Sequence, residues 1–374
     1  MDPPSFSWHD LAKKQASGEP KQFRLFAITE GESDMNFSLL SVDVAKEVFQ
    51  LHGIDAVGEP RLRRRVRREE LLRVLESIPK TRVVLEAGWS SHHWAREIRN
   101  LGHQTDLIAP QHVKPFVQTN KSDANDAAAI CEAARRPGMK FIGVKTVEQQ
   151  EIQMLHRVRS RHVRQRTALC NEIRGFLSEY GVVMKLGVKA VRVKLSETLR
   201  ENDELSSIAR ETFEELAEEL RRLDAKVTRY DNLFEKIAEA HPVCERLQKV
   251  KGIGPLTATA LIASAAEPHR FKNGRAFAAN LGLVPRHSGT GGHNKIGSMS
   301  KRGDVYLRQL LIHGARSALR TAKKRADKQS LWSIRVMERV GFNKAVVALA
   351  NKNARIVWKL MTTDQSYNSN LAAA

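Results

Sequence analysis

The decisive stretch of this sequence reads Lys121-Ser122-Asp123-Ala124-Asn125-Asp126-Ala127-Ala128-Ala129-Ile130. The alanine run predicts a helix that begins near Asp123, and the spacing puts Asp123 and Asp126 on one face of it. Capping of the helix start explains one aspartate but gives no reason for the second. Two carboxylates that point the same way repel each other unless a cation neutralises them, and Mg²⁺ prefers such oxygens. The plainer interpretation is a cap followed by a solvated charge, so the rest of the chain has to decide.

The composition predicts a polyanionic partner. The 374 residues carry a formal net charge of +20, and the isoelectric point is near 10.1. Basic residues are dispersed through patterned segments, which excludes a histone-like tail. Three widely separated cysteines (Cys131, Cys170 and Cys244) give neither a disulfide framework nor a zinc-ligand spacing. No apolar run approaches the ~20 residues that cross a bilayer, and no signal peptide precedes the first patterned segment. We therefore expect a protein of the bacterial cytosol or nucleoid, with no membrane partner.

Short apolar strands alternate with helices in residues 36–146, the pattern of an α/β sheet with helices on its faces. Two of these strands, 37–43 and 82–86, end in an acid, Asp43 and Glu86. Functional groups gather at strand ends in such sheets, so these acids are expected to meet the pair that starts the later helix. Four acids from three elements fit a site for one or two Mg²⁺ (or Mn²⁺) ions in phosphodiester chemistry. Asp43 alone reads equally well as a strand-end residue that faces water.

From residue 147 the pattern becomes helical. Three arginines, Arg157, Arg161 and Arg164, follow i, i+4, i+7 spacing and therefore share one face of the helix. Such a face either lies along phosphates or is simply solvated. Between 205 and 239 the apolar residues alternate steps of three and four, which predicts a coiled-coil seam. The seam pairs either with the helix at 147–180 or with another subunit, and we favour a contribution to oligomerisation.

A glycine turn between two short helices, Lys251-Gly252-Ile253-Gly254-Pro255, resembles the helix-hairpin-helix element of DNA-binding proteins. Glycines permit a tight turn, and the N–H groups that open the second helix can hold a phosphate. Lys251, Gly252 and Gly254 are therefore predicted nucleic-acid contacts. A generic turn between helices is the alternative.

Residues 282–304 form a stretch rich in glycine, hydroxyl and basic side chains, too long for a mere connection. It offers hydroxyls for nucleophilic attack, and it offers cations for a phosphate. The predicted phosphate contacts are Arg286, Lys295, Lys301 and Arg302. The alternative is a flexible linker, although the flanking helices look like parts of one compact unit.

With these stretches in view, residues 36–361 resemble the DEDD-type insertion-sequence transposases of the 110/1111 group, a family that includes the Piv-like invertases. Each motif alone is weak, but their order and spacing together are specific. The motifs are Ser41-Val42-Asp43-Val44-Ala45-Lys46, Leu85-Glu86-Ala87, Lys121-Ser122-Asp123-Ala124-Asn125-Asp126-Ala127, Gly252-Ile253-Gly254-Pro255, Gly282-Leu283-Val284-Pro285-Arg286 and Ser300-Lys301-Arg302-Gly303-Asp304.

The resemblance implies an α/β plus all-α architecture. Its parts are a flexible extension (1–35), a RuvC-like, RNase H-like domain (36–146), a coiled-coil region (147–243), a mainly helical transposase domain (244–362) and a disordered tail (363–374). It also implies that Asp43, Glu86, Asp123 and Asp126 bind the metal ion. Implied partners are double-stranded DNA at the element ends and target, a structured non-coding RNA that guides recombination, and further copies of the chain in a dimer or tetramer.

The family further implies a hydroxyl nucleophile in the C-terminal domain, and here the sequence departs from the usual pattern. Family members often carry serine where this chain has Thr290. Either Thr290 or nearby Ser288 is the nucleophile, with Ser298 and Ser300 weaker choices. Our leading hypothesis is a recombinase that excises and inserts its own element.

Two alternatives stay open. A RuvC-like, structure-specific nuclease would need the four acids and no hydroxyl stretch, so substitutions of Ser288 and Thr290 discriminate it from a recombinase. A non-enzymatic nucleic-acid-binding scaffold would keep its role after loss of Asp43 or Glu86.

Overall fold

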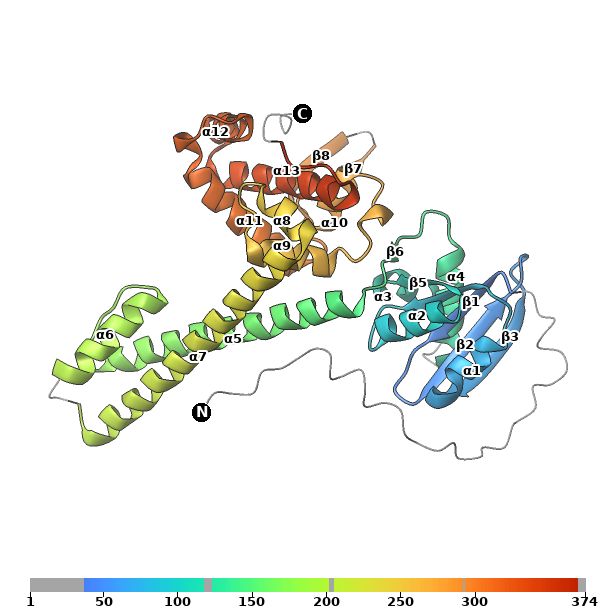
Figure 1. The fold of residues 1–374 in the computed structure, drawn as a ribbon, viewed down its shortest axis with the longest axis horizontal. Coiled ribbons are helices and arrows are strands. Elements are labelled where there is room, and N and C mark those ends of the chain that lie inside the picture. The colour runs from blue at the N-terminus through green and yellow to red at the C-terminus, as the bar shows by residue number, and fades with distance from the viewer. Residues whose placement is uncertain (1–36, 118–122, 202–204, 292, 369–374) are drawn as a thin grey trace.

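The structure, a computed structural model, describes residues 37–117, 123–201, 205–291 and 293–368. The extension predicted at 1–35 lies outside this part of the chain. Figure 1 shows a sheet domain, a helical domain and an arm of long helices. One long helix leaves the sheet domain and runs to the tip of the arm, and a second returns to the helical domain. None of the described helices is long and apolar enough to span a bilayer.

The sheet of the N-terminal domain is mixed, with six strands in the order β3-β2-β1-β4-β5-β6. Strand β1 is antiparallel to β2 and parallel to β4, β4 is parallel to β5, and β6 is an antiparallel edge strand. The strands are β1 (Leu39–Asp43), β2 (Val48–Ile54), β3 (Pro60–Arg67), β4 (Arg82–Glu86), β5 (Gln104–Ile108) and β6 (Phe141–Ile142).

Helices cover both faces of this sheet because the central strands are apolar on both sides. On one face Val42 and Leu85 pack with Trp94 of α2. On the other face Val84 packs with Ile130 of α4. The helices of the domain are α1 (Leu71–Glu76), α2 (Ser91–Asn100), α3 (Pro110–Val113) and α4 (Asp123–Arg135).

The arm consists of α5 (Val147–Glu179), α6 (Val188–Glu201) and α7 (Ser207–Ala240). The predicted seam pairs α7 with α5 of the same chain, and Arg159–Asp231 and Arg166–Asp224 ion pairs cross between the two helices. Because the seam is used within the chain, it gives no support to oligomerisation, which stays a prediction. The buried seam residues are Phe213, Leu220, Leu223, Val227 and Phe234.

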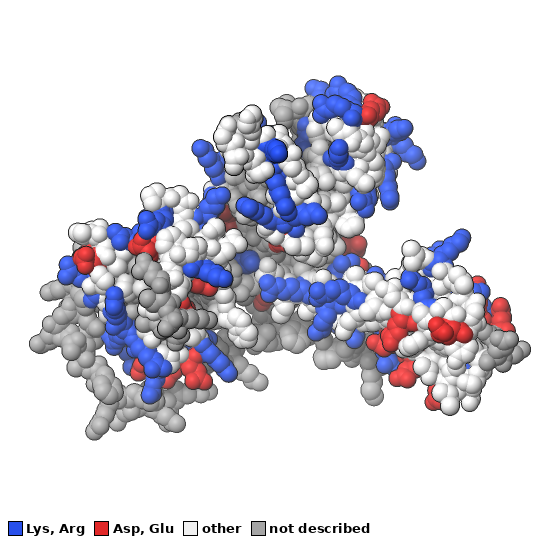
Figure 2. Space-filling model, turned by 180° about the vertical axis from the view of Figure 1, so that it is seen from behind, with Lys and Arg blue, Asp and Glu red and all other residues white. Residues whose placement is uncertain are grey.

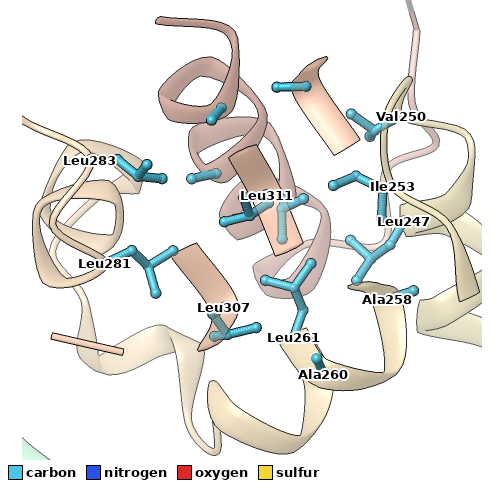
Figure 3. Packing of buried hydrophobic residues seen from close by; sticks show 14 of the residues in the cluster. Leu247, Val250, Ile253, Ala258, Ala260, Leu261, Leu281, Leu283, Leu307 and Leu311 are labelled. Atoms are coloured by element: carbon cyan, nitrogen blue, oxygen red, sulfur yellow. The ribbon is translucent and has the colours of Figure 1, made fainter. Parts of the chain in front are cut away.

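The C-terminal domain is helical apart from one two-stranded hairpin. Figure 3 shows its core, where Leu261 of one helix points toward Leu307 and Leu311 of another. Two helices, α8 and α9, flank the turn at Gly252, as the predicted helix-hairpin-helix element requires. The elements are α8 (Pro242–Gln248), α9 (Pro255–Ser264), α10 (Gly274–Asn280), β7 (Pro285–Thr290), β8 (His293–Met299), α11 (Val305–Arg320), α12 (Lys328–Val340) and α13 (Phe342–Thr362).

The structure differs from the sequence predictions in several places. The stretch 282–304, for which no strand was predicted, is largely the β7–β8 hairpin. Strand β2 extends to Gly53 and Ile54, because the two residues pair with both neighbouring strands. Helices α6 and α12 and strand β6 were not predicted. The tail at 363–374 was predicted to be disordered, yet the Tyr367 hydroxyl donates to Gln329, and 369–374 lie outside the described residues.

Candidate active site and nucleic-acid interface

Asp43 and Glu86 end two neighbouring parallel strands. Val42 pairs with Leu85, so the acids that follow them are neighbours at the same edge of the sheet. Side chains alternate along a strand, so Asp43 shares a face with Leu39, and Glu86 shares it with Val84. Leu39 and Val84 belong to the core beneath α4. Both acids therefore lie on the α4 face, and both are partly buried.

Helix α4 brings the other two acids to this edge. The Ser41 hydroxyl donates to the backbone oxygen of Ala127 (2.6 Å) near the start of α4. At the other end of the helix, Arg135 donates to the backbone oxygen of Val57 (3.1 Å), beyond the end of β2. Because β2 is antiparallel to β1, α4 runs against β1 and starts where β1 ends. The structure thus places Asp126, next to Ala127, at the edge where Asp43 ends β1.

The helix start puts the backbone of Asp123 at the same edge, but its side chain lies outside the described part of the structure. Among the described side chains, no group of three histidines, cysteines or acids is close enough to hold a metal ion. Asp43 and Glu86 both interact with neighbouring groups. The metal-binding role of the tetrad therefore stays a prediction, supported by the shared edge.

Asp55 shows what an acid with a purely structural role looks like in this domain. It follows β2, and its carboxylate accepts hydrogen bonds from the N–H groups of Val57 (3.0 Å), Gly58 (2.8 Å) and Glu59 (2.9 Å). The Arg61 side chain donates to it (2.8 Å), and this bond lowers the pKa of Asp55 to about 2. The stretch Gly53-Ile54-Asp55 also places an acid after a strand, but this acid caps a turn at the opposite edge of the sheet.

The two candidate nucleophiles lie on the β7–β8 hairpin. Thr290 pairs with His293, and Ser288 pairs with Lys295. Residues two apart in a strand share a face, so Ser288 and Thr290 point the same way, and both are exposed. Sequence reasoning missed the hairpin and with it His293 opposite Thr290. The available signal was Gly291-Gly292 between extended segments, a recognised hairpin turn.

Buried contacts at the base of the hairpin fix its position. The N–H of Ser300 donates to the backbone oxygen of Val284 (2.8 Å). The buried guanidinium of Arg308 donates to the backbone oxygens of Leu281 (3.0 Å) and Arg302 (2.9 Å), one on each side of the hairpin. The hairpin is therefore a rigid projection from a packed domain. Four predicted phosphate contacts are exposed on it or beside it: Arg286, Lys295, Lys301 and Arg302.

Part of the turn before α9 packs against the rest of the helical domain. Gly252 has a positive φ of 88°, and a Cβ there would overlap the backbone of Gly314 in α11. Lys251 was predicted to contact a phosphate, but in the structure its ammonium group forms an ion pair with Asp327 of the same chain. A Cβ at Gly254 would meet no described atom within 4 Å, so the start of α9 stays open.

Arginines on the arm divide by the direction they face. Arg159 and Arg166 pair with aspartates of α7, whereas Arg157, Arg161 and Arg164 are exposed, as their spacing predicts. None of these three takes part in an ion pair that the structure describes. Figure 2 shows Lys and Arg gathered over the helical domain and the middle of the molecule, and Asp and Glu gathered at the end of the arm.

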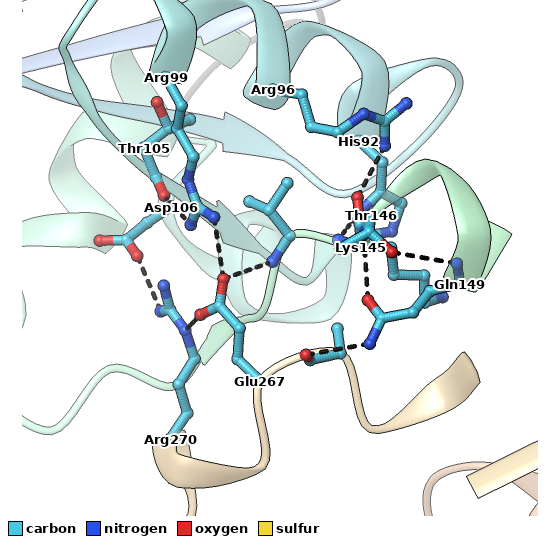
Figure 4. Close-up of polar contacts among 12 residues, drawn as sticks. His92, Arg96, Arg99, Thr105, Asp106, Lys145, Thr146, Gln149, Glu267 and Arg270 are labelled. Carbon is cyan, nitrogen blue, oxygen red and sulfur yellow. Dashed lines mark hydrogen bonds and ion pairs between the residues drawn. The ribbon is translucent and has the colours of Figure 1, made fainter. Parts of the chain in front are cut away.

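Polar contacts join the sheet domain to the helical domain, which sequence reasoning did not predict. Glu267 accepts hydrogen bonds from Arg99 (3.0 Å) and from the N–H of Val144 (3.2 Å), and Arg270 pairs with Asp106 (2.8 Å). Figure 4 shows these side chains converging from both domains. Burial alone would raise the pKa of Asp106, but hydrogen bonds from Arg82 and Arg270 outweigh it and lower that pKa.

The fold and its surface define a nucleic-acid-directed protein with acids at one sheet edge and hydroxyls on a basic hairpin. Residues 40–182 match the model of a DEDD-type transposase, and residues 244–330 match that of the transposase IS116/IS110/IS902 family. The "Probable family 20 transposase" of Pseudomonas aeruginosa is 46% identical over 335 residues, which cover 89% of this chain and 99% of that protein.

Two further relatives are transposases of insertion sequences. The IS1111A transposase of Coxiella burnetii is 44% identical over 89% of this chain and 92% of its own length. The IS1328 transposase of Yersinia enterocolitica is 35% identical over 87% of this chain and 97% of its own length. The chain belongs to the IS116/IS110/IS902 family and is an insertion-sequence DNA transposase.

Proposed function

We propose that this transposase cuts and rejoins DNA with Mg²⁺ (or Mn²⁺) held by Asp43, Glu86, Asp123 and Asp126, and with a hydroxyl of the β7–β8 hairpin as nucleophile. The observation that carries the proposal is the shared edge of the acids. Asp43 and Glu86 come from adjacent parallel strands, and α4 starts at the same place. Carboxylates placed this way suit a divalent cation. When bound, the ion would neutralise charge at the phosphate.

The sheet topology supports a RuvC-like, RNase H-like assignment of the N-terminal domain. An antiparallel meander of β3, β2 and β1 is followed by parallel β4 and β5, with helices on both faces. Strands β1 and β4 end in two of the candidate metal ligands, Asp43 and Glu86. We infer that α4 closes the site by placing its acidic start over those strand ends.

The hydroxyl would supply a covalent route. Its oxygen gives up its proton as it attacks a backbone phosphorus. One protein–phosphate bond forms and one phosphorus–oxygen bond of the DNA breaks, with the leaving oxygen taking up a proton in exchange. The reverse step rejoins the strand, so the bond energy is conserved and no external energy source is needed. Thr290 is our first choice because it ends β7 at the tip of the hairpin, and His293 lies opposite it. Ser288, on the same face, is the second choice.

Nucleic-acid partners follow from the charge. The net charge of +20 and the exposed basic residues of α5 and the hairpin favour binding of DNA at the element ends and target. The proposal also includes a structured RNA that guides recombination and assembly into a dimer or tetramer. The net charge is compatible with both.

Strand cleavage of a labelled element end tests the proposal. We expect Asp43→Asn and Glu86→Gln to lower the cleavage rate at least about a hundredfold, because a charge that stabilises the transition state is lost. Asp55→Asn is the matched control: it removes an acid of the same sheet at the opposite edge and should leave the cleavage rate unchanged. Unchanged cleavage by both acid variants would show that these acids take no part in the cut. A wild type that cuts no DNA, together with element mobility that survives loss of Asp43 or Glu86, would favour the non-enzymatic scaffold.

A further inference from the structure

The turn between β4 and α2 presents a tryptophan to solvent. Trp89 is 92% exposed, the highest value among the large apolar residues that the structure describes. Aromatic side chains bury large areas on folding, so this residue forgoes a stabilisation that the other described tryptophans obtain at least in part. An indole left in water at one specific place suggests a binding partner for its ring.

An ordered turn holds the indole outward. The N–H of Ala87 donates to the backbone oxygen of Ile108 (2.8 Å), which extends the β4–β5 pairing past Glu86. The Ser91 hydroxyl accepts from the N–H of Gly88 (3.1 Å) and donates to its oxygen (3.0 Å). Ser90 adopts a left-handed backbone with φ 53°, which non-glycine residues rarely do. The exposure of Trp89 is thus built into the turn.

The edge of the sheet where Asp43 and Glu86 end their strands is called the acid edge below. Trp89 follows Glu86, the last residue of β4, by three positions and therefore lies at this edge. Cationic residues flank the same edge on its other side. Arg67, at the end of β3, pairs with Val48 at the start of β2, and Arg68 donates to the backbone oxygen of Lys46 (3.4 Å) in the β1–β2 turn. Carboxylates, cations and one exposed aromatic ring thus meet along one edge.

We propose that Trp89 stacks on an unpaired DNA base next to the phosphate at which the acids of the proposed site act. Cations at the edge suit the neighbouring phosphates, and an aromatic ring suits the face of a base. The base has to be unpaired or flipped, because a base inside a duplex has both faces covered by its neighbours. The contact is tolerant of sequence, since every base has such a face. The proposal rests on the proposed function in that it takes DNA as the substrate of this edge.

A binding cycle between the tryptophan and single bases tests the proposal. Labelled element-end DNAs, each with one nucleotide replaced by an abasic residue, are titrated with the wild type, Trp89→Ala and Trp89→Phe, with Ca²⁺ in place of Mg²⁺. On intact DNA we expect Trp89→Ala to bind about tenfold more weakly, and Trp89→Phe to bind nearly as the wild type does. At one abasic position the wild type and Trp89→Ala should bind equally.

Val57→Ala is the matched control, because Val57 is also apolar and exposed (81%) but lies at the opposite edge of the sheet. Equal binding by Trp89→Ala and the wild type on intact DNA, or an equal loss at every abasic position, would overturn the proposal. The proposal would also fail if Trp89→Ala loses affinity only in concert with abasic positions in the element's RNA. It would fail as well if Trp89→Ala forms a smaller oligomer than the wild type in sedimentation and shows no coupling with any DNA position. If the coupling is found but the wild type cuts no DNA in Mg²⁺, the proposed function fails and the stacking contact stands.

Discussion

The acid edge and the hydroxyl hairpin are the two halves of the proposed site, and they are built in opposite ways. Asp43 and Glu86 end strands whose preceding residues, Val42 and Leu85, are fully buried. Every described residue of β7 is exposed, and the hairpin is fixed only at its base. An acid at the end of a buried strand is held by the core. A hydroxyl on the exposed hairpin is held by strand pairing alone, and its side chain faces solvent, where it can receive DNA.

This difference also bears on how the two halves meet. The contacts of Glu267 and Arg270 with Arg99, Asp106 and Val144 fix the sheet domain against the helical domain. In Figure 1 the hairpin and the sheet belong to separate domains of the chain. This junction opposes a large domain movement, so under the proposed assembly into a dimer or tetramer the hairpin of another copy is a candidate partner for the acids.

The largest effect is expected from the packing of α11 against the turn before α9. A Cβ at Gly314 would overlap the backbone oxygen of Gly252, and neither the helix nor the turn can move without disturbing the domain core. Gly314→Ala should lower the free energy of unfolding by about 3 kcal/mol or more. Ile296→Ala, on the exposed hairpin, should change it by less than about 0.5 kcal/mol. Urea unfolding measures both, and similar values for the two variants would contradict this contrast.

A mixed assembly tests where the two halves meet. Asp126→Ala and Thr290→Ala, each inactive alone, are co-expressed with different tags and purified through both tags. If the site forms between copies, one composite site in the mixed assembly is intact, and strand cleavage returns. If acids and hydroxyl act within one chain, every site lacks one group and the mixed assembly stays inactive. Two wild-type chains with the same two tags provide the reference rate.

The buried His156 and the half-buried His92 predict an acid-sensitive fold. Burial lowers the pKa of His156, whose ring bonds to Thr259 (3.1 Å), to about 3, and it lowers the pKa of His92 to about 4. The unfolded chain takes up these protons near pH 6.5, so stability is complete above that pH and is lost as the pH falls toward the folded values. For His156 the loss is about 1.4 kcal/mol per pH unit.

Urea unfolding at several pH values between 7.5 and 5 measures this slope. The His156→Gln variant should be less stable at neutral pH and should lose stability less steeply in acid. A slope that stays the same in the variant would show that the proton uptake occurs elsewhere.

The smallest effect is expected on the arm. Replacing Arg157, Arg161 and Arg164 by alanine should weaken DNA binding and lower the salt dependence of the affinity by up to about 0.9 per lost phosphate contact. Stability should be almost unchanged because the three side chains are exposed. Arg159→Ala is the control, since its partner Asp231 places it in the helix pair and its loss should affect stability instead. An unchanged salt dependence in the triple variant would identify this face as merely solvated.

The sequence predicts local patterns well where the core imposes them. Strand β4 follows from its apolar run, and the long helix α7 follows from its unbroken periodicity. The hairpin was missed because glycine and hydroxyl residues with both sides exposed show no alternation of apolar and polar side chains. The partner of the α7 seam could not be chosen, because a heptad pattern is the same for a partner within the chain or in another copy.

Contacts between distant parts of the chain were beyond sequence reasoning altogether. Glu267 and Arg99 are 168 positions apart, and nothing in either neighbourhood indicates the other. The acids of the candidate site were found because strand ends in one sheet share an edge, a rule that needs no knowledge of such contacts. The exposure of Trp89 is visible only in the structure, because its place in the sequence gives no sign of it.

The central claim is that a hairpin hydroxyl attacks DNA with help from the acid edge, and a covalent protein–DNA adduct is its direct signature. The protein, the RNA from the element's end and a labelled element junction are incubated with Mg²⁺ and separated on a denaturing gel. We expect an adduct with the wild type that is lost in Asp126→Ala and in Thr290→Ala and kept in Ser288→Ala. Loss in Ser288→Ala alone would move the role to Ser288. Cleaved DNA with free ends and no adduct, unaffected by either hydroxyl substitution, would contradict the mechanism and indicate a simple nuclease.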